Sequence, residues 1–234
     1  MAQKKKTENL KTIVCYGDSN TWGFLPVTED TDRENQARYP EDIRWPTVMA
    51  RLLGDGYRVR EEGLNGRTTA LTDILSKYRN GAKYLGVCLS TAKPLDLLII
   101  MLGSNDTKNY MRASSEHIGR GVEKLVKIAR AEGYGPDGAP PKILIITPAY
   151  IREAALGSPL GLEFDENSIQ KSRELAGIYY EIARRYDCYY MNAAVYVEAS
   201  KVDGLHLDAK NHKKLADAIA TKVREIFETD KTSQ

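Results

Sequence analysis

Two uninterrupted apolar runs constrain the fold of this 234-residue chain more than any other feature of its sequence. Leu97–Leu102 and Ile143–Ile146 contain no polar residue, which is typical of strands that are covered on both faces in a parallel sheet. Helix-period patterns lie between the apolar runs and supply the crossover connections that parallel strands require. The sequence therefore predicts an α/β protein, a three-layer α/β/α sandwich around a mostly parallel five-stranded sheet.

The predicted elements alternate along the whole chain. The five predicted strands are Thr12–Tyr16, Tyr57–Glu61, Leu95–Leu102, Lys142–Thr147 and Cys188–Asn192. Helices are predicted at Trp45–Leu53 and Ala82–Thr91, and wherever apolar residues recur at helical spacing, over residues 118–129, 175–183 and 215–227. No repeat or linker divides the chain, so we expect one domain over residues 11–229, between a polar tail at 1–10 and a short tail at 230–234.

Charge and composition exclude several kinds of partner. Lys and Arg number 34 and Asp and Glu number 32, and the net charge of +2 gives no electrostatic basis for binding nucleic acid or a membrane surface. No apolar stretch approaches the ~18–20 residues of a membrane span. Three widely spaced cysteines, Cys15, Cys88 and Cys188, indicate reduced thiols and a cytoplasmic protein. Because phosphate-binding, dinucleotide-binding and metal-ligand patterns are absent from the sequence, we expect no cofactor and no metal.

Residues that can supply a hydroxyl, a backbone N–H or an amide follow three of the predicted strands at the point where each strand ends. Ser19 follows the first strand, Gly66 the second and Asn105 the third. Because the carboxyl ends of parallel strands lie along one edge of a sheet, we expect these residues to converge. Ser19 would be a nucleophile, and its own N–H, the Gly66 N–H and the Asn105 amide would form an oxyanion hole. Helix and turn capping could explain each of these residues separately, but it does not explain why all three occur at the ends of neighbouring strands.

A base for this nucleophile is expected near the C-terminus. Asp203 and His206 lie three residues apart, just before the last predicted helix. Across a turn, this spacing lets the Asp203 carboxylate reach Nδ1 of His206 and leaves Nε2 for Ser19. The other two histidines, His117 and His212, lie at the beginnings of predicted helices, and we expect both at the surface.

The blocks that carry these residues resemble those of the SGNH (GDSL) hydrolase family, whose signature residues are Ser, Gly, Asn and His. The resemblance covers nearly the whole chain and looks like the arylesterase/acyltransferase branch. It has two departures: Asn20 stands where many relatives carry leucine, and the segment Ala149–Asn167 has no firm counterpart in the family. It implies a flavodoxin-like fold, a Ser19–His206–Asp203 triad and action on short acyl esters, with transfer of acetyl to alcohols or peroxide in some members. Oligomers are common in that branch. The matching blocks are residues 16–23, 61–69, 99–108 and 203–206.

We therefore expect a serine esterase that hydrolyses short-chain acetyl esters through an acyl-enzyme and that also transfers the acyl group to alcohols. The expected partners are a small ester and other copies of the chain. A carbohydrate deacetylase of the acetylxylan type stays open as an alternative, and so does a non-catalytic ligand-binding domain on the same fold.

Three further features concern the substrate pocket. Trp22, three residues after the nucleophile, either binds substrate in the acyl pocket or packs as a core aromatic residue. Two long segments, Phe24–Ile43 and Ala149–Asn167, come shortly after the carboxyl ends of predicted strands. Ligands of open α/β sheets bind at these ends, so both segments are candidates for the walls of the pocket.

Overall fold

Five strands in the described part of the chain form one sheet in which every neighbouring pair is parallel. The computed structural model describes residues 10–28 and 37–228. The strand order β2-β1-β3-β4-β5 is the flavodoxin-like order, and it confirms the predicted fold class. The strands agree closely with those predicted: β1 (Lys11–Gly17), β2 (Tyr57–Gly63), β3 (Leu97–Met101), β4 (Lys142–Thr147) and β5 (Tyr189–Asn192).

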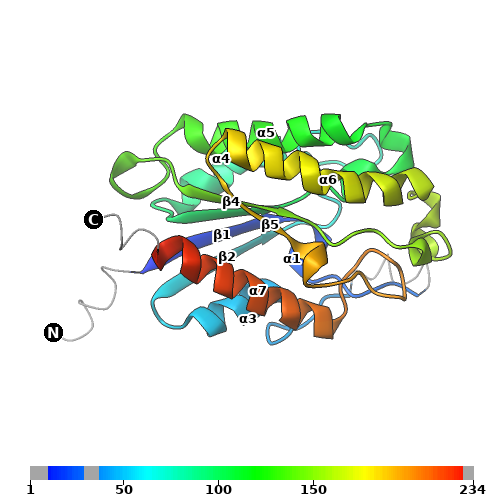
Figure 1. Cartoon of the computed structure of the whole chain (residues 1–234), viewed down its shortest axis with the longest axis horizontal. Helices are drawn as coiled ribbons and strands as arrows, with labels where there is room; N and C mark the ends of the chain where they lie inside the picture. Colours follow the sequence, from blue (N-terminus) through cyan, green and yellow to red (C-terminus); the bar gives the residue numbers. More distant parts are fainter. Residues whose placement is uncertain (1–9, 29–36, 229–234) are drawn as a thin grey trace.

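Helices cover both faces of this sheet. Figure 1 shows α5 and α6 on one side of the strands and α3 and α7 on the other. The helices are α1 (Ser19–Trp22), α3 (Trp45–Leu53), α4 (Gly81–Ala92), α5 (Ser115–Ala131), α6 (Glu166–Arg185) and α7 (Ala209–Glu228). Short 3₁₀ turns lie in the connections: η1 (Asn105–Thr107), η2 (Asn109–Met111), η3 (Pro136–Gly138), η4 (Glu153–Ala155), η5 (Pro159–Leu162) and η6 (Ala193–Val195).

Alternate residues of the central strands belong to two separate hydrophobic cores. In β3, Leu98 and Ile100 pack in the core that α4, α5 and α6 cover. Leu97 and Ile99 point the other way and pack in the core that α3 and α7 cover. All four side chains are buried. Burial on both faces explains why the strand is apolar at every position.

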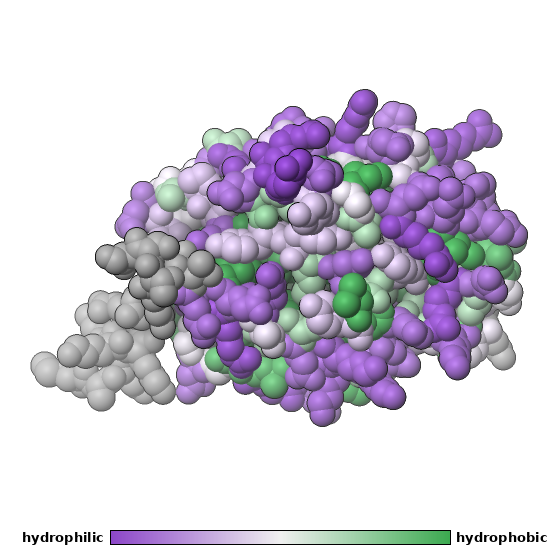
Figure 2. Space-filling view, in the orientation of Figure 1, coloured by the Kyte–Doolittle hydropathy of each residue, from purple (hydrophilic) through white to green (hydrophobic). Residues whose placement is uncertain are grey.

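The face of the molecule seen in Figure 2 is largely polar, with apolar residues scattered over it, and the predicted tails fall largely outside the described residues. Within the described residues, no helix has the length and hydrophobicity needed to cross a membrane. The predicted tails, apart from Leu10, lie outside the described residues, so the domain limits 11–229 stay a prediction.

His212 is buried, and the expectation that it lies at the surface is wrong. None of its surface is exposed, and its Nδ1 accepts a hydrogen bond from the Trp45 N–H at 3.3 Å. The lysines around it in the sequence pointed to an exposed position, but His212 lies on the apolar face of α7, in helical register with Leu215 and Ile219. Burial lowers the pKa of His212 to about 4. His117, by contrast, is exposed as expected.

We expect His212 to make the protein less stable in mild acid. The folded protein keeps the ring neutral down to about pH 4, whereas the unfolded chain protonates it near its ordinary pKa of about 6.5. Above about pH 6.5 the ring is neutral in both the folded and the unfolded state, so it does not change the free energy of unfolding. As the pH falls from about 6.5 to about 4, the free energy of unfolding should therefore decrease, by about 3 kcal/mol in total.

The measurement is denaturant unfolding of the wild type and of His212→Asn between about pH 4 and about pH 8. Asparagine keeps an acceptor close to the Trp45 N–H but does not titrate. Because every other group titrates in both proteins, the difference between their unfolding free energies isolates the histidine. Parallel stability curves for the two proteins would contradict the prediction.

Candidate active site

Ser19 is the first residue of α1 and lies directly beyond the carboxyl end of β1. Asp18 caps this short helix by accepting a hydrogen bond from the Asn20 N–H at 3.0 Å, so Asp18 and not Ser19 has the capping role. The helix also passes very close to the end of β2, because a Cβ on Gly63 would lie 2.2 Å from the Trp22 nitrogen. Any side chain at Gly63 would displace the helix, and Ser19 with it, from the edge of the sheet.

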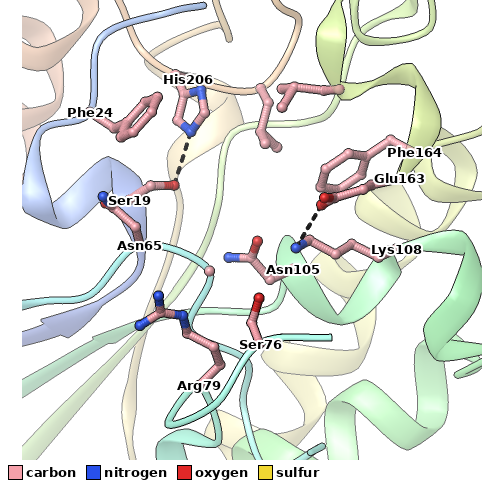
Figure 3. Close-up of a pocket in the computed structure, with 13 residues that line it drawn as sticks. Ser19, Phe24, Asn65, Ser76, Arg79, Asn105, Lys108, Glu163, Phe164 and His206 are labelled. Atoms are coloured by element: carbon pink, nitrogen blue, oxygen red, sulfur yellow. Dashed lines mark hydrogen bonds and ion pairs between the residues drawn. The ribbon is translucent and has the colours of Figure 1, made fainter. Parts of the chain in front are cut away.

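Ser19, His206 and Asp203 form a continuous chain of hydrogen bonds. His206 Nε2 lies 3.0 Å from Ser19 Oγ, a contact drawn in Figure 3. His206 Nδ1 lies 2.6 Å from Asp203 Oδ2. All three side chains are buried. The structure thus brings together three residues from opposite ends of the chain, in the order that nucleophile, base and orienting carboxylate require.

Four donors surround the Asp203 carboxylate. Oδ2 receives the Nδ1–H of His206 and, at 3.0 Å, the Val27 N–H. Oδ1 accepts from the backbone N–H groups of Leu205 and His206, at 3.1 and 2.9 Å. Burial acts to raise the pKa of this carboxyl, but the hydrogen bonds and the charge of His206 outweigh it, so the pKa lies below its ordinary value. Asp203 is therefore ionised at neutral pH and holds the proton of His206 on Nδ1.

Asn20 connects the histidine loop to the helix that carries the nucleophile. Its side-chain N–H donates to the Leu205 carbonyl at 3.2 Å, and its Oδ1 accepts from the Leu207 N–H at 2.9 Å. These two bonds hold the backbone on either side of His206. A leucine at position 20 could form neither bond, so in this chain hydrogen bonds, and not packing alone, set the distance from His206 to Ser19.

Gly66 and Asn105 lie on the neighbouring strand ends and line the same cavity as Ser19. Gly66 has a φ of 76°, which glycine adopts without strain. Asn105 donates one amide hydrogen to the Arg67 carbonyl at 3.1 Å, and its second hydrogen is left for the pocket that it faces in Figure 3. In the described part of the chain, the N–H groups of Ser19 and Gly66 donate to no backbone carbonyl. Three donors are therefore available beside the Ser19 hydroxyl.

Two buried charged residues hold the turn of Gly66 against the strand ends. The Arg67 guanidinium donates to the Gly17 carbonyl at 2.9 Å. Asp106 accepts from the Thr69 N–H at 3.0 Å and from the Thr69 hydroxyl at 2.6 Å. Burial raises the pKa of Asp106 to about 7, although these hydrogen bonds act to lower it. Neither residue was among those predicted from the sequence, although both lie inside the blocks that resemble the family.

A cavity of about 160 Å³ opens in front of Ser19. Apolar and polar side chains both line it: Phe24 lies beside His206, whereas Phe164 lies beside Glu163 and Lys108 across the pocket (Figure 3). The apolar lining residues are Phe24, Leu160, Phe164 and Leu205, and the remaining polar ones are Asn65, Ser76, Arg79, Lys108 and Glu163.

Trp22 does not line this cavity, so the structure does not bring it to the pocket. Its ring packs against Phe24, with centroids 6.0 Å apart, and the Arg38 guanidinium lies 4.8 Å from its centroid. Of the two alternatives that the sequence left open, the structure shows packing. Phe24, and not Trp22, packs against the base, with its ring 4.7 Å from that of His206.

Both long segments reach the pocket. Phe24 comes from the segment Phe24–Ile43, of which residues 29–36 lie outside the described residues. Glu163 and its apolar neighbours come from the segment Ala149–Asn167. The polar residues Ser76, Arg79 and Lys108 were not identified from the sequence; the signal that could have indicated them is their position in connections that leave the carboxyl ends of β2 and β3.

A serine, a histidine and a buried carboxylate in hydrogen-bonded order, with three further donors on residues that line the same cavity, are the parts of an acyl-transfer site. Among residues 10–28 and 37–228, no group of His, Cys, Asp and Glu side chains is arranged to hold a metal ion. At the carboxyl edge of a parallel α/β sheet, this arrangement defines the class of serine acyl hydrolases. The chain belongs to the GDSL-like lipase/acylhydrolase family, whose sequence pattern it matches over residues 15–214, and this confirms the resemblance seen in the sequence.

Three known proteins that are similar to this chain are named as esterases. The native aryl esterase of M. smegmatis is 37% identical, with a TM-score of 0.84 over 92% of this chain and 99% of its own. A carbohydrate acetylesterase from Sinorhizobium meliloti is 35% identical, with a TM-score of 0.81 over 92% of this chain and 99% of its own. An acetylxylan esterase from Xylanibacter ruminicola is 26% identical over 93% of this chain, which spans only 44% of that relative's length. The family and these relatives place the chain among the carboxylic ester hydrolases.

Proposed function

We propose that this protein is a serine esterase that hydrolyses short-chain, acetyl-type esters through an acyl-enzyme. The observation that carries the proposal is the hydrogen-bonded chain from Ser19 through His206 to Asp203, with its distances of 3.0 and 2.6 Å. The small cavity in front of Ser19 suits a short acyl group. The esterase relatives at 35% and 37% identity support the same activity.

In the proposed reaction, Ser19 Oγ attacks the ester carbonyl while His206 Nε2 takes the hydroxyl proton. The N–H groups of Ser19 and Gly66 and the Asn105 amide stabilise the negative oxygen that forms. The C–O bond of the ester then breaks, and Nε2–H protonates the departing alcohol. Water, deprotonated by His206, attacks the acyl-enzyme, releases the acid and restores the Ser19 hydroxyl. Asp203 orients the imidazole and stabilises its positive charge throughout.

The test is p-nitrophenyl acetate hydrolysis together with labelling by a fluorophosphonate, followed by mass spectrometry of the modified peptide. An activated serine reacts covalently with this probe, so the label is expected on Ser19. The same experiment separates an enzyme from the ligand-binding alternative, because a domain without an activated serine does not react. Absence of both hydrolysis and labelling in folded protein would remove the proposed function.

A second substrate class is favoured by the polar part of the pocket wall. Asn65, Ser76 and Lys108 present hydrogen-bonding groups close to the reacting serine, as a sugar hydroxyl would require. Two of the relatives are named for carbohydrate or xylan esters. We propose acetylated carbohydrates as the alternative natural substrate, and release of acetate from acetylated xylo-oligosaccharides tests it.

Asn105→Ala is expected to lower kcat by about 10²–10³-fold with little change in KM. The amide that faces the pocket would bind the oxyanion of the transition state more strongly than the carbonyl of the bound ester, so its loss affects the reaction step. Steady-state kinetics on p-nitrophenyl acetate separate the two constants. An increase in KM at unchanged kcat would remove the oxyanion role of Asn105.

We also propose acyl transfer to small alcohols. The acceptor must approach His206 Nε2 through a cavity that Phe24, Phe164 and Leu205 line with apolar side chains. Each buried CH₂ group of an alcohol gains about 0.8 kcal/mol that water does not. Incubation with vinyl acetate and benzyl alcohol in water is therefore expected to yield benzyl acetate, measured against acetate. Acetate alone, over a range of alcohol concentrations, would leave a plain esterase.

We also propose a cytoplasmic location and association of several copies of the chain. Cys15, Cys88 and Cys188 are free thiols, which supports a reducing, cytoplasmic location. Exposed apolar side chains on the connection between β2 and α4 and on α4, namely Ile74, Leu75, Tyr78 and Val87, support association of several copies of the chain.

A further inference from the structure

A cationic side chain faces the pocket with no partner of its own. Arg79 lines the cavity in front of Ser19. Its side chain passes beside Gly66, since a Cβ on that glycine would lie 3.3 Å from Arg79 Nε. In the described part of the chain, the guanidinium has no hydrogen bond or ion pair. Figure 3 shows Arg79 at the end of the pocket away from His206.

The backbone that carries Arg79 is held firmly in place. The Arg79 carbonyl accepts from the Thr68 N–H at 2.9 Å and from the Thr68 hydroxyl at 3.1 Å. Asp73 accepts from the N–H groups of Leu75 and Ser76, at 2.8 and 3.0 Å. These bonds use main-chain groups of the connection between β2 and α4. These bonds fix the position of the Arg79 backbone, whereas its guanidinium stabilises no other part of the chain that the structure describes.

The other cation in the described lining of the pocket, Lys108, has carboxylate partners. Lys108 Nζ lies 2.8 Å from Glu163 Oε2 and 3.8 Å from Oδ2 of the buried Asp73. The lysine therefore already has two anionic partners within the protein. Among the described lining residues, Arg79 is thus the charge without a counter-ion. A negative group on a bound molecule would supply that counter-ion.

We propose that Arg79 selects esters that carry a carboxylate or similar anion close to the scissile bond. The inference rests on the proposed esterase function and names the chemical class of its substrate. A guanidinium presents paired N–H donors that match the two oxygens of a carboxylate. Ser76, which lines the same pocket, offers a hydroxyl donor beside it. The anion can belong to the acyl part or to the alcohol part of the ester, and separate substrates distinguish these sources.

The experiment compares kcat/KM for an anionic ester with kcat/KM for its neutral methyl ester. For the alcohol side the pair is para-acetoxybenzoate and methyl para-acetoxybenzoate. For the acyl side it is monomethyl succinate and dimethyl succinate. Arg79→Gln is expected to lower the anionic-to-neutral ratio by about tenfold on at least one pair. Added salt should reduce the wild-type preference, and Arg79→Glu should lower the ratio further.

Lys77→Gln is the matched control. Lys77 is exposed in the same connection, two residues from Arg79, and lies outside the pocket lining. The anionic-to-neutral ratio of kcat/KM in Lys77→Gln should stay within about twofold of the wild-type ratio, as expected for an exposed charge. An unchanged ratio in Arg79→Gln on both pairs, or an equal loss on anionic and neutral esters, would overturn the proposal. Failure of the esterase function is recognised separately, because the wild type would then hydrolyse no neutral ester.

Discussion

Ser19→Ala is expected to lower kcat/KM for p-nitrophenyl acetate by about 10⁴-fold or more. Alanine lacks the hydroxyl that would form the acyl-enzyme, so His206 has no nucleophile to activate. Folding should be little affected, because the Ser19 hydroxyl makes its hydrogen bond to the His206 side chain and not to the backbone of another element. The measurements are hydrolysis rates, fluorophosphonate labelling and thermal unfolding of the variant and the wild type.

Ser90→Ala provides the matched control for this change. Ser90 lies on the exposed side of α4, where its hydroxyl donates to the Gly86 carbonyl at 2.8 Å. We expect wild-type rates and normal labelling from this variant. Hydrolysis that survives in folded Ser19→Ala at the wild-type rate would show that a different residue is the nucleophile.

Asp203→Asn is expected to lower kcat by about 10⁴-fold, as the corresponding change does in a Ser-His-Asp protease. Both carboxylate oxygens receive N–H donors, from His206, Val27 and Leu205. An asparagine amide must therefore place its NH₂ group against at least one donor, whichever way it is turned. If the NH₂ group faces His206, the ring must present Nδ1 as an acceptor and carry its proton on Nε2. That tautomer cannot take the proton of Ser19.

Asp208→Asn is the matched control for Asp203→Asn. Asp208 accepts from the Asn211 N–H at 2.8 Å at the start of α7, and asparagine is an equally good residue for such a cap. Asp208→Asn should therefore keep both activity and stability. Thermal unfolding of Asp203→Asn shows whether activity is lost because the His206 proton is on the wrong nitrogen, in a protein of normal stability, or because the loop is misfolded. Normal kcat in folded Asp203→Asn would remove the orienting role of Asp203.

The parts of the site that could be predicted are those with a local signal. Ser19 and Asn105 each follow an apolar run that can be recognised without the fold, and a parallel sheet brings such strand ends to one edge. Asp203 and His206 are three residues apart, so a turn alone is enough to bring their side chains together. Their contact is seen at 2.6 Å.

The choice between the two aromatic residues near Ser19 could not be predicted. Trp22 ends a four-residue helix, and Gly23 then turns the chain in the left-handed conformation, with a φ of 90°. This turn places Phe24, and not Trp22, against the His206 ring. The direction in which the chain leaves the helix depends on packing with the histidine loop, which is distant in the sequence.

By itself, the sequence determined the fold class, the strand positions and the family, and it located the residues that we propose as nucleophile, base and oxyanion donors. All of these depend on periodicity or short spacing, which neighbouring residues reveal. Only the tertiary structure decided that His212 is buried beneath Trp45, 167 positions away, and that Arg79 lies beside Gly66 in the pocket. Burial and charge balance depend on which segments meet in space, and no local pattern of residues carries that information.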